Sequence, residues 1–326
     1  FFRKNSKENG HYHSNWLSMM LPRLYIARNL LREDGVIFVS CDDNEVHNLR
    51  ALAAEVFGEE NIVGIRVWQK GTKSAKLIGI THEYMLAIAR NKTALLDQGV
   101  WRKRKEGVDD VLAKYRELRQ VHGTDHPRIE AEMQAWFAAL PSDDPRKAHS
   151  HYKCSDDRGL YFPDNFHGPD DGRTSRPRYI IKHPMTGKAC KMPSTGWRWE
   201  EPRARKALAL KPPLIHFGED HTTIPCRKSY LHVVDSSSLQ SVFYKDGRAG
   251  TLAVEALVGK GVFDFPKDVD TLQEVIEVVL YPRPKKAAWS DDDEDDSALE
   301  PPRFDEVEKT TQQASVKDAP IVLDFF

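Results

Sequence analysis

The chain has 326 residues and a formal net charge of −1, with 48 basic and 49 acidic side chains and 40% hydrophobic residues. This length allows one large domain or two ordinary ones, with a core that needs no disulfides. Four cysteines without a CxxC pair argue against a disulfide scaffold and the common zinc sites, and the lack of an 18-residue apolar run argues against a membrane span. We therefore expect a protein of the reducing cytoplasm.

The first third of the chain alternates helical and strand patterns. Residues 14–33 carry apolar side chains three or four positions apart, which predicts a helix. Residues 36–40 form a continuous apolar run with β-branched side chains, which is typical of a strand buried on both faces. Asp43 or Asn44 can then cap a second helix over 46–57. Helix, buried strand and helix in this order predict an α/β fold.

The alternation continues toward residue 140. Strands are expected over 62–68 and 84–89, joined by a loop that is basic and rich in small residues between Lys70 and Lys76. Two further helices are expected over 108–118 and 129–140.

The middle of the chain is less regular and strongly basic. From residue 141 to about 213, Gly, Pro, Arg and aromatic residues dominate, and 179–183 with 189–192 predict a hairpin. Between Arg146 and Lys228 there are 17 basic and 9 acidic residues. Such a basic stretch favours a phosphate-bearing partner, although a solvated charged surface is the alternative.

The last third combines two helical patterns with an acidic segment. Helices are expected over 251–258 and 270–280, and a buried strand over 321–323. Residues 281–317 are Pro-rich, contain an acidic run and lack apolar periodicity, so they are expected to be disordered or to form a surface excursion. Between Asp264 and Lys309 there are 6 basic and 15 acidic residues, so the near-zero net charge hides an uneven distribution.

Several segments, taken in this order, resemble the methylation (Mod) subunit of type III restriction-modification systems. These are adenine-N6 DNA methyltransferases of the permuted class, in which the catalytic motif precedes the cofactor-binding motif. The segments are HYHSNWLSMMLPRLYIARNLLREDGVIFVSCDDNEVHNLRALAAEVFGEENIV (11–63), THEYMLAIAR (81–90), GWRW (196–199) in a basic region, FDFPKDVDTLQEVIEVV (263–279) and IVLDFF (321–326).

The resemblance implies an α/β fold: a partial Rossmann-like methyltransferase sheet with an inserted irregular α+β target-recognition region. The domain organisation that it implies is part of the methyltransferase domain at 1–100, a DNA-binding target-recognition region at 101–235, cofactor-side helices at 236–283, an acidic disordered insert at 284–318 and the start of the cofactor-loop strand at 319–326.

The catalytic motif of the resembled family is Asp-Pro-Pro-Tyr, which holds the amine of a flipped-out adenine. This chain has only Lys211-Pro212-Pro213-Leu214 and Glu300-Pro301-Pro302-Arg303, and neither has an aromatic residue in fourth place. The resemblance places the motif before Phe1, so we assign no catalytic residue and expect an interior fragment that is inactive alone. In the family fold the strand of that motif would separate the strands at 36–40 and 321–323.

The resemblance implies S-adenosylmethionine as cofactor, bound at the segment that enters the last predicted helix and at the start of the cofactor loop. Taken alone, FDFPK is also explained as a helix start with a core phenyl pair, in which Pro266 sets the first turn. Asp42 and Asp43 follow a buried strand, at the edge where α/β sheets place ligands. The implied cofactor residues are Phe263, Asp264, Phe265, Pro266, Lys267, Asp324, Phe325 and Phe326.

The basic middle segment interleaves cations with aromatic residues, as readers of DNA sequence do. The alternative is an irregular subdomain with a tryptophan core. The residues expected to contact DNA are Arg173, Arg176, Arg178, Lys182, Lys188, Lys191, Trp197, Arg198 and Trp199.

The predicted function is methyl transfer from S-adenosylmethionine to adenine N6 in a specific sequence of double-stranded DNA. The resemblance implies a homodimer of methylation subunits, an ATP-dependent restriction subunit and no membrane partner. A non-catalytic DNA-binding remnant is the alternative, and action on RNA or on cytosine in DNA is a third. No metal site is expected, because the histidine pairs lack a second ligand pair at zinc-like spacing.

Overall fold

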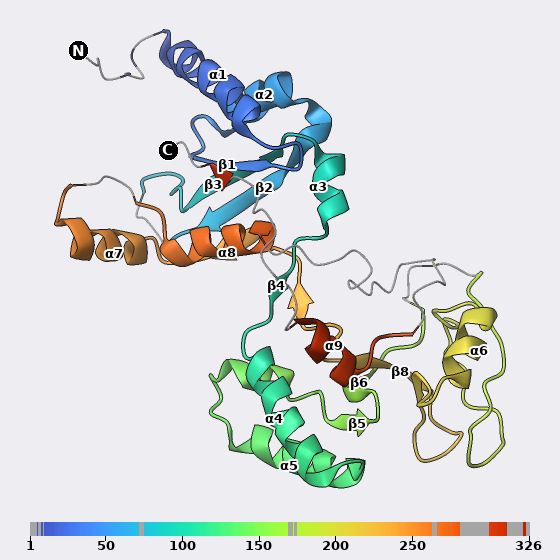
Figure 1. The fold of residues 1–326 in the computed structure, drawn as a ribbon. Coiled ribbons are helices and arrows are strands. Elements are labelled where there is room, and N and C mark those ends of the chain that lie inside the picture. The colour runs from blue at the N-terminus through green and yellow to red at the C-terminus, as the bar shows by residue number, and fades with distance from the viewer. Residues whose placement is uncertain are drawn as a thin grey trace. The chain divides into compact units, whose positions relative to one another are not determined.

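The computed structural model describes residues 5, 8, 10–71, 75–168, 172, 175–262, 266–280, 300–311 and 322–323. The chain divides into two compact units, which are described separately below (Figure 1). Unit 1 comprises Phe1–Lys103, Ser238–Lys285 and Val316–Phe326, and unit 2 comprises Arg104–Ser237 and Lys286–Ser315.

Unit 1 is an α/β unit built around one mixed sheet. The strands follow the order β10-β2-β3-β1-β11, in which β3 is antiparallel to both β1 and β2, while β10 and β11 are parallel to their neighbours. Its elements are α1 (Tyr12–Leu30), β1 (Val36–Cys41), α2 (Val46–Phe57), the 3-10 turn η1 (Glu59–Asn61), β2 (Ile62–Gln69), β3 (His82–Ala89), α3 (Lys92–Gln98), β10 (Val242–Tyr244), α7 (Arg248–Val258), α8 (Val269–Leu280) and β11 (Val322–Leu323).

The alternation of side chains along β1 explains the layers of unit 1. Ile37 and Val39 point to one face, where they pack with α1 and α2. Val36 and Phe38 point to the opposite face, where they pack with α3 and α8. Helices therefore cover both faces of the sheet, and α1 and α2 lie across it from α8 (Figure 1). This burial on both sides is what the continuous apolar run of the strand predicts.

The predicted helices of unit 1 form, but the start of α2 differs from the expected cap. Its N-cap residue is Glu45, and no side chain caps the helix. Instead, the Asp42 carboxylate accepts a hydrogen bond from the Asn44 N–H at 3.0 Å, which folds the turn ahead of the helix. Asp43 and Asn44 are therefore turn residues rather than caps.

The pairing of β1 with the edge strand β11 differs from the order that the resemblance implies. Val36 and Ile37 of β1 pair directly, in parallel register, with Val322 and Leu323 of β11. In the described part of the chain no strand separates the two, so β1 and β11 pair across the place where the family fold would have the strand of the catalytic motif. The backbone N–H and C=O groups on this side of β1 pair with β11, because leaving them without hydrogen-bond partners would destabilise the fold.

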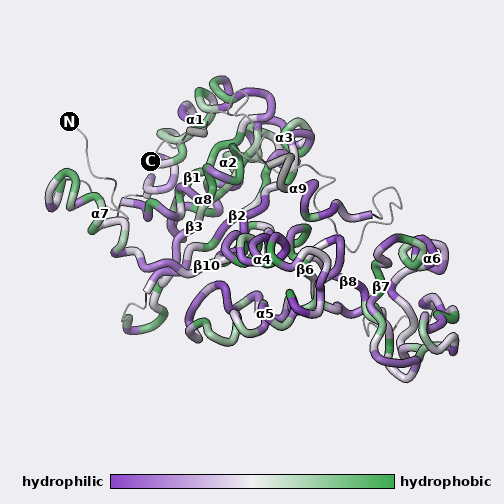
Figure 2. The backbone as a smooth tube through the Cα atoms, turned by 60° about the horizontal axis from the view of Figure 1, so that its bottom comes forward, coloured by the Kyte–Doolittle hydropathy of each residue, from purple (hydrophilic) through white to green (hydrophobic). Residues whose placement is uncertain are grey.

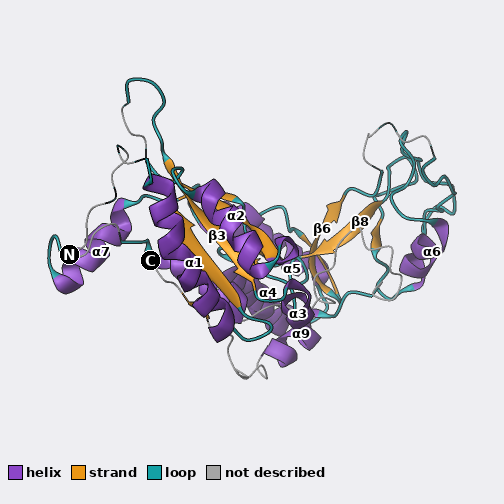
Figure 3. Cartoon of the chain, turned by 90° about the horizontal axis from the view of Figure 1, so that it is seen from above, coloured by secondary structure: helices purple, strands orange, loops and turns teal. Residues whose placement is uncertain are grey.

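Unit 2 is an α+β unit with a four-stranded antiparallel sheet in the order β5-β6-β8-β7. Its longest strand pair, β6 with β8, is seen in Figure 3. A separate short ladder joins β9 to β4, where β4 straddles the unit boundary along the chain. The elements are β4 (Lys103–Arg104), α4 (Val108–His122), α5 (His126–Ala139), the 3-10 turn η2 (Pro145–His149), β5 (Cys154–Asp156), β6 (Gly159–Asp164), α6 (Glu201–Ala209), β7 (Ile215–His216), β8 (Cys226–Tyr230), β9 (Ser236–Ser237) and α9 (Phe304–Thr311).

A half-buried carboxylate organises the sheet of unit 2. Asp156 at the end of β5 accepts hydrogen bonds from the Lys228 ammonium at 2.7 Å and the Tyr230 hydroxyl at 2.9 Å. The Lys228 side chain is only 8% exposed and lies over the Tyr161 ring. Because a buried cation without a partner is strongly destabilising, Asp156 is required for this arrangement.

Two further expectations change in unit 2. Within the acidic segment, residues 304–311 form α9, and its first residue, Phe304, is buried against Tyr115 and His232. This part of the segment is therefore ordered, because it supplies a core side chain. The hairpin expected over 179–192 is a turn with one isolated bridge, Lys182 to Ala189, rather than a pair of strands. None of the helices in the described residues is long and apolar enough to cross a membrane.

Candidate functional site

The carboxyl end of β1 lies at an edge of unit 1 where several segments meet. Cys41, the last residue of β1, pairs with Tyr84 near the start of β3. Gln69, the last residue of β2, pairs with His82 of β3 and with Tyr244 of β10. The ends of β1, β2 and β10 and the start of β3 therefore share one edge. This is the edge at which open α/β sheets bind ligands.

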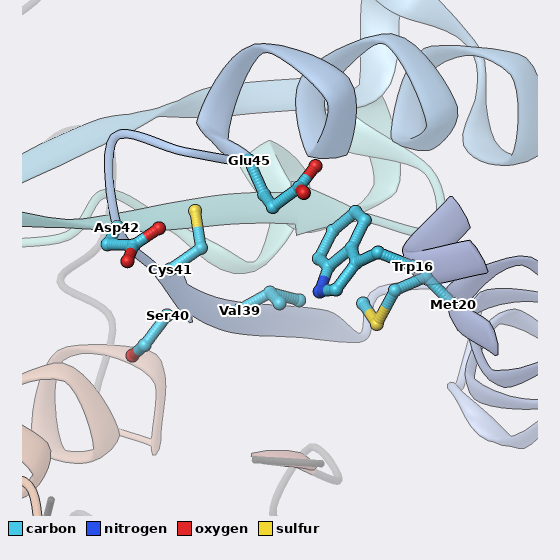
Figure 4. A pocket seen from close by; sticks show the side chains of 7 residues that line it. All are labelled: Trp16, Met20, Val39, Ser40, Cys41, Asp42 and Glu45. Atoms are coloured by element: carbon cyan, nitrogen blue, oxygen red, sulfur yellow. The ribbon is translucent and has the colours of Figure 1, made fainter. Parts of the chain in front are cut away.

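A cavity of about 170 Å³ opens at this edge, between α1 and the end of β1. An apolar cavity of roughly 150 Å³ accommodates one benzene molecule, so this space suits a single aromatic ring. Figure 4 shows Trp16 and Met20 reaching from α1 toward the strand, with the side chains of Cys41 and Glu45 on the same side. The lining residues are Trp16, Met20, Val39, Ser40, Cys41, Asp42 and Glu45.

Glu45 is a buried carboxylate held in place at the rim of this cavity. Its side chain is 7% exposed, and one oxygen lies 2.8 Å from Nδ1 of His13. The other oxygen accepts a hydrogen bond from the Asn48 amide at 2.8 Å. Since both oxygens have partners, the carboxylate is fixed in orientation.

The thiol of Cys41 lines the cavity in its neutral form. Burial, and after it the neighbouring Asp42 carboxylate, raise the pKa of this thiol from its usual 9.0 to about 12. A thiol with this pKa is protonated at neutral pH and is therefore a poor nucleophile. Among the residues that the structure describes, no group of three His, Cys, Asp or Glu side chains could hold a metal ion.

An ion-pair chain brings the predicted cofactor segment to the same edge. The Lys267 ammonium donates to Glu83 of β3 at 2.8 Å, and Lys70, just after β2, pairs with the other oxygen of Glu83. Burial acts to raise the pKa of Glu83, but the hydrogen bonds from Lys267 and Lys70 outweigh it and the pKa lies below its usual 4.5. The carboxylate is therefore ionised at neutral pH and holds both cations.

Two backbone features fix the approach of this segment to the sheet. A Cβ atom at Gly250 of α7 would lie 2.7 Å from the Lys267 carbonyl oxygen, so only glycine permits this contact. Asp268 then caps α8, because its carboxylate accepts a hydrogen bond from the Thr271 N–H at 3.0 Å. The backbone of Lys267 is thus fixed between its close contact with α7 and the start of α8.

The described residues contain two of the eight predicted cofactor positions. Pro266 is buried and Lys267 is half-buried at the edge just described. The other six lie outside the described residues: Phe263, Asp264, Phe265, Asp324, Phe325 and Phe326.

The predicted DNA-contacting segment separates into core and surface residues. Trp197 is 0% exposed and Trp199 is 3% exposed, and both pack in the core of unit 2 with Phe166. The indole N–H of Trp197 donates to the Tyr179 carbonyl at 2.9 Å. Neither ring is accessible to a base, so the alternative of a tryptophan core is correct for these two residues.

The described cations of the segment lie on or near the surface. Arg173 lies outside the described residues, and Arg176 packs its side chain against Gly168. Arg198 is half-buried, whereas the exposed cations are Arg178, Lys182, Lys188 and Lys191.

A buried histidine anchors the exposed turn between Lys182 and Lys188. His183 is 2% exposed, its backbone N–H donates to the Lys188 carbonyl at 2.8 Å, and its Nδ1 accepts from the Met185 N–H at 3.3 Å. Its Nε2 lies 3.1 Å from the Gly218 carbonyl oxygen. The two lysines therefore project from a turn of defined shape.

Sequence reasoning missed the side chains that build the edge of unit 1. Trp16 was interpreted only as part of an apolar helix face, although it lines the cavity. Glu45 gave no signal, because its partner His13 lies 32 residues away in the chain. Glu83 had a weak signal, since it is an acidic residue at the start of an otherwise apolar strand.

Comparisons with known proteins agree with the family resemblance. The sequence pattern of a DNA methylase family, the N6/N4 methyltransferases, matches residues 2–193. The chain is 34% identical over 247 residues to the type III restriction-modification enzyme EcoP15I Mod subunit of Escherichia coli, covering 75% of this chain and 37% of that protein.

Two more distant relatives extend the comparison. The chain is 26% identical over 278 residues to the EcoPI Mod subunit of Escherichia phage P1, covering 82% of this chain and 39% of that protein. It is 24% identical over 283 residues to the type II methyltransferase M.KpnI of Klebsiella pneumoniae, covering 83% and 59%. The chain spans less than two thirds of the length of each of these relatives. The chain therefore belongs to the DNA methylase family, in which the relatives that it matches include Mod subunits of type III restriction-modification enzymes.

Proposed function

We propose that this chain serves the transfer of a methyl group from S-adenosylmethionine to N6 of adenine in double-stranded DNA. Unit 1 contributes the edge that binds the methyl donor, and unit 2 contributes contacts to DNA. The observation that carries the proposal is the Lys267–Glu83–Lys70 chain, because it joins the segment resembling the family's cofactor motif to the ligand-binding edge of the sheet.

The residues at the edge fit parts of the methyl donor. An ammonium has three protons, and the bond to Glu83 uses one of those on Lys267, so others are left for the donor's carboxylate. The cavity beside Trp16 has an aromatic wall on which the purine ring of the donor can stack. When bound, S-adenosylmethionine supplies an electrophilic methyl group on its sulfonium. The chain's own part is to orient that donor and to exclude water from one side of it.

No residue of the chain is assigned to the chemical step. The family's Asp-Pro-Pro-Tyr motif does not occur in the sequence. The buried Glu45 carboxylate, which His13 and Asn48 hold, lines the same cavity as Trp16.

Unit 2 offers cations for the phosphate backbone. Lys182 and Lys188 project from the His183-anchored turn, and Lys191 follows it closely in the chain. Lysine contacts to phosphates position a protein on a duplex, whereas base recognition needs side chains in a groove. We therefore propose these lysines as positioning contacts. We propose a second methylation subunit and a restriction subunit as partners, and the names of the matched relatives, Mod subunits of restriction-modification enzymes, support the restriction subunit.

Calorimetric titration with S-adenosylmethionine tests the proposed cofactor site. Lys267→Met keeps the aliphatic stem but removes the charge, and we expect it to weaken binding about tenfold, the effect of losing one charged hydrogen bond. Lys114→Met in α4 of unit 2 is the matched control and leaves binding unchanged. If the wild-type chain binds DNA in a salt-dependent manner but no cofactor, the alternative of a non-catalytic DNA-binding protein is supported instead.

A further inference from the structure

The loop between β2 and β3 carries two apolar side chains that are almost fully exposed. Leu77 is 96% exposed and Ile78 is 87% exposed. Single exposed apolar residues are ordinary on protein surfaces, but an adjacent pair at this exposure leaves nearly all of its surface in water. No function described above uses this pair.

The base of this loop is firmly fixed to the sheet. The Lys70 N–H donates to the Thr81 carbonyl at 2.7 Å, which closes the loop where the strands end. The Lys70 ammonium lies 4.7 Å from the centre of the Trp68 ring, and the Trp68 indole N–H donates to the Lys245 carbonyl at 2.9 Å. The exposed pair therefore extends from a rigid support.

The loop leaves unit 1 at the edge that holds the candidate cofactor site. Gln69 pairs with His82 across the loop, and two residues further along β3, Tyr84 pairs with Cys41 at the cavity. Glu83, between them, pairs with both Lys70 and Lys267. A duplex whose adenine enters this edge would meet the loop.

The charge of the loop favours a negatively charged partner, such as the phosphate backbone of DNA, over a neutral or basic protein surface. The sequence from Lys70 to Thr81 contains three lysines and no acidic residue, and Lys76 directly precedes the apolar pair. Lys76 is exposed and can contact a phosphate while the neighbouring side chains enter the stack. Cations beside exposed leucine or isoleucine are the side chains with which proteins wedge open base steps.

We infer that Leu77 and Ile78 form a wedge that enters the DNA base stack beside the adenine that leaves it, with Lys76 on the adjacent phosphate. The inference rests on the proposed function, because a base that is methylated at this edge must leave the duplex. The apolar pair would fill the space next to the vacated position, so that the helix does not close again. The ligand is duplex DNA. The apolar pair recognises it by disrupting base stacking rather than by contacting base edges.

Fluorescence anisotropy with two 30-base-pair duplexes of the same sequence, one intact and one with a single abasic site, tests this wedge. A wedge inserts most easily where a base is missing, so we expect the wild-type chain to bind the abasic duplex about tenfold more tightly. The double variant Leu77→Ser/Ile78→Ser should lose this preference, to about twofold or less. Val121→Ser, at a position 68% exposed on α4, is the control that keeps it.

A second readout separates insertion from simple attraction. A 2-aminopurine beside the abasic site should brighten when the wild-type chain unstacks it, and the double variant should leave it dim. Lys76→Gln should instead weaken binding to both duplexes equally and lower the salt slope by about one. Circular dichroism of each variant confirms that the chain is folded.

The outcomes distinguish the wedge from the function on which it rests. Binding to both duplexes with equal affinity, or a preference that survives in the double variant, overturns the wedge and leaves the proposed function intact. If the wild-type chain binds neither duplex at low salt, both proposals fail. A double variant that changes only the oligomeric state, with DNA binding unaltered, shows that the apolar pair serves a protein contact and overturns the wedge.

Discussion

Unit 1 and unit 2 bury their cores by different means. Unit 1 stacks apolar helices on both faces of a sheet, and its polar groups gather at the strand ends around Glu45 and Glu83. Unit 2 combines aromatic side chains with buried ions, among them Lys228 and the fully buried Arg158, which donates to the Pro301 carbonyl at 2.6 Å. A sheet covered by helices on both faces leaves its strand ends available for a ligand. The stability of an irregular core depends instead on particular hydrogen-bonded and ion-paired side chains.

The two units also differ in their exposed apolar surface. In unit 1, α7 buries only Gly250, and Figure 2 colours much of this helix as hydrophobic. Leu252 and Leu257 on it are 64% and 84% exposed. Among the described residues of unit 2, the most exposed large apolar side chain is Met185 at 86%, within the basic turn. The most exposed apolar side chains of unit 1 thus lie on the loop between β2 and β3 and on α7, while that of unit 2 lies between Lys182 and Lys188.

The largest expected effect tests whether the core of unit 2 depends on its tryptophans. Trp197→Ala removes a fully buried ring and the hydrogen bond to Tyr179, and we expect it to destabilise the protein by about 3–5 kcal/mol. Urea unfolding followed by circular dichroism measures the change. Met185→Ala, at an 86% exposed position, should alter the free energy of unfolding by less than about 0.5 kcal/mol. A Trp197→Ala variant as stable as the Met185→Ala variant would contradict the core assignment.

The next effect tests the buried ions of unit 2. Asp156→Ala leaves the Lys228 ammonium buried without its carboxylate, which should cost about 3 kcal/mol. Replacing the pair together, as Asp156→Ala/Lys228→Met, should recover more than half of that loss, because the uncompensated charge is then gone. Equal stability of the single and double variants in urea would show that Asp156 acts through other contacts.

The ion pair of unit 1 should matter less for stability, because it is more exposed. Glu83 is 25% exposed, and Glu83→Gln should destabilise by about 1 kcal/mol at pH 7. The bonds from Lys267 and Lys70 lower the pKa of Glu83 below its usual 4.5 despite burial. The contribution of the pair is therefore complete above about pH 4.5 and is lost as the pH falls through the folded-state pKa. Unfolding between pH 3 and pH 7 should show a smaller loss of stability in Glu83→Gln than in the wild type, and parallel curves would be evidence against the pair.

The smallest effect on stability belongs to the exposed turn of unit 2. Lys182→Gln/Lys188→Gln should change the free energy of unfolding by less than about 0.5 kcal/mol, since both side chains are exposed. The same variant should lower the slope of log K against log salt for duplex DNA by about 2, because two phosphate contacts are lost. Lys114→Gln/Lys206→Gln, which removes two cations elsewhere in unit 2, is the control. An unchanged slope in the turn variant would remove these lysines from the DNA surface.

The contrast between the units also explains what the sequence predicted. The helix at Tyr12–Leu30 and the strand at Val36–Cys41 followed from periodicity, because apolar spacing records which faces are buried. The segment at 179–192 looked like a hairpin but is a turn anchored by His183, whose partner Gly218 lies 35 residues away. Local patterns cannot reveal contacts of this kind.

The candidate site was predictable only in part for the same reason. The resemblance indicated Lys267, but its partner Glu83 lies 184 residues earlier in the chain. Tryptophans beside arginines, as in the GWRW segment, are typical of surfaces that bind nucleic acid, but these two are buried in the core. Only the packing of the folded chain distinguishes these two possibilities. The two tryptophans are core residues, whereas DNA contact by the cations beside them stays a prediction.

A crossed binding measurement tests most directly the central claim that the two units divide the work. Affinities for S-adenosylmethionine and for duplex DNA are measured on two variants, Lys267→Met in unit 1 and Lys182→Gln/Lys188→Gln in unit 2. The division predicts that the first variant loses about tenfold in cofactor affinity with DNA binding unchanged, and that the second keeps its cofactor affinity and loses salt-dependent DNA binding. Loss of cofactor affinity in the unit 2 variant, with none in the unit 1 variant, would contradict it.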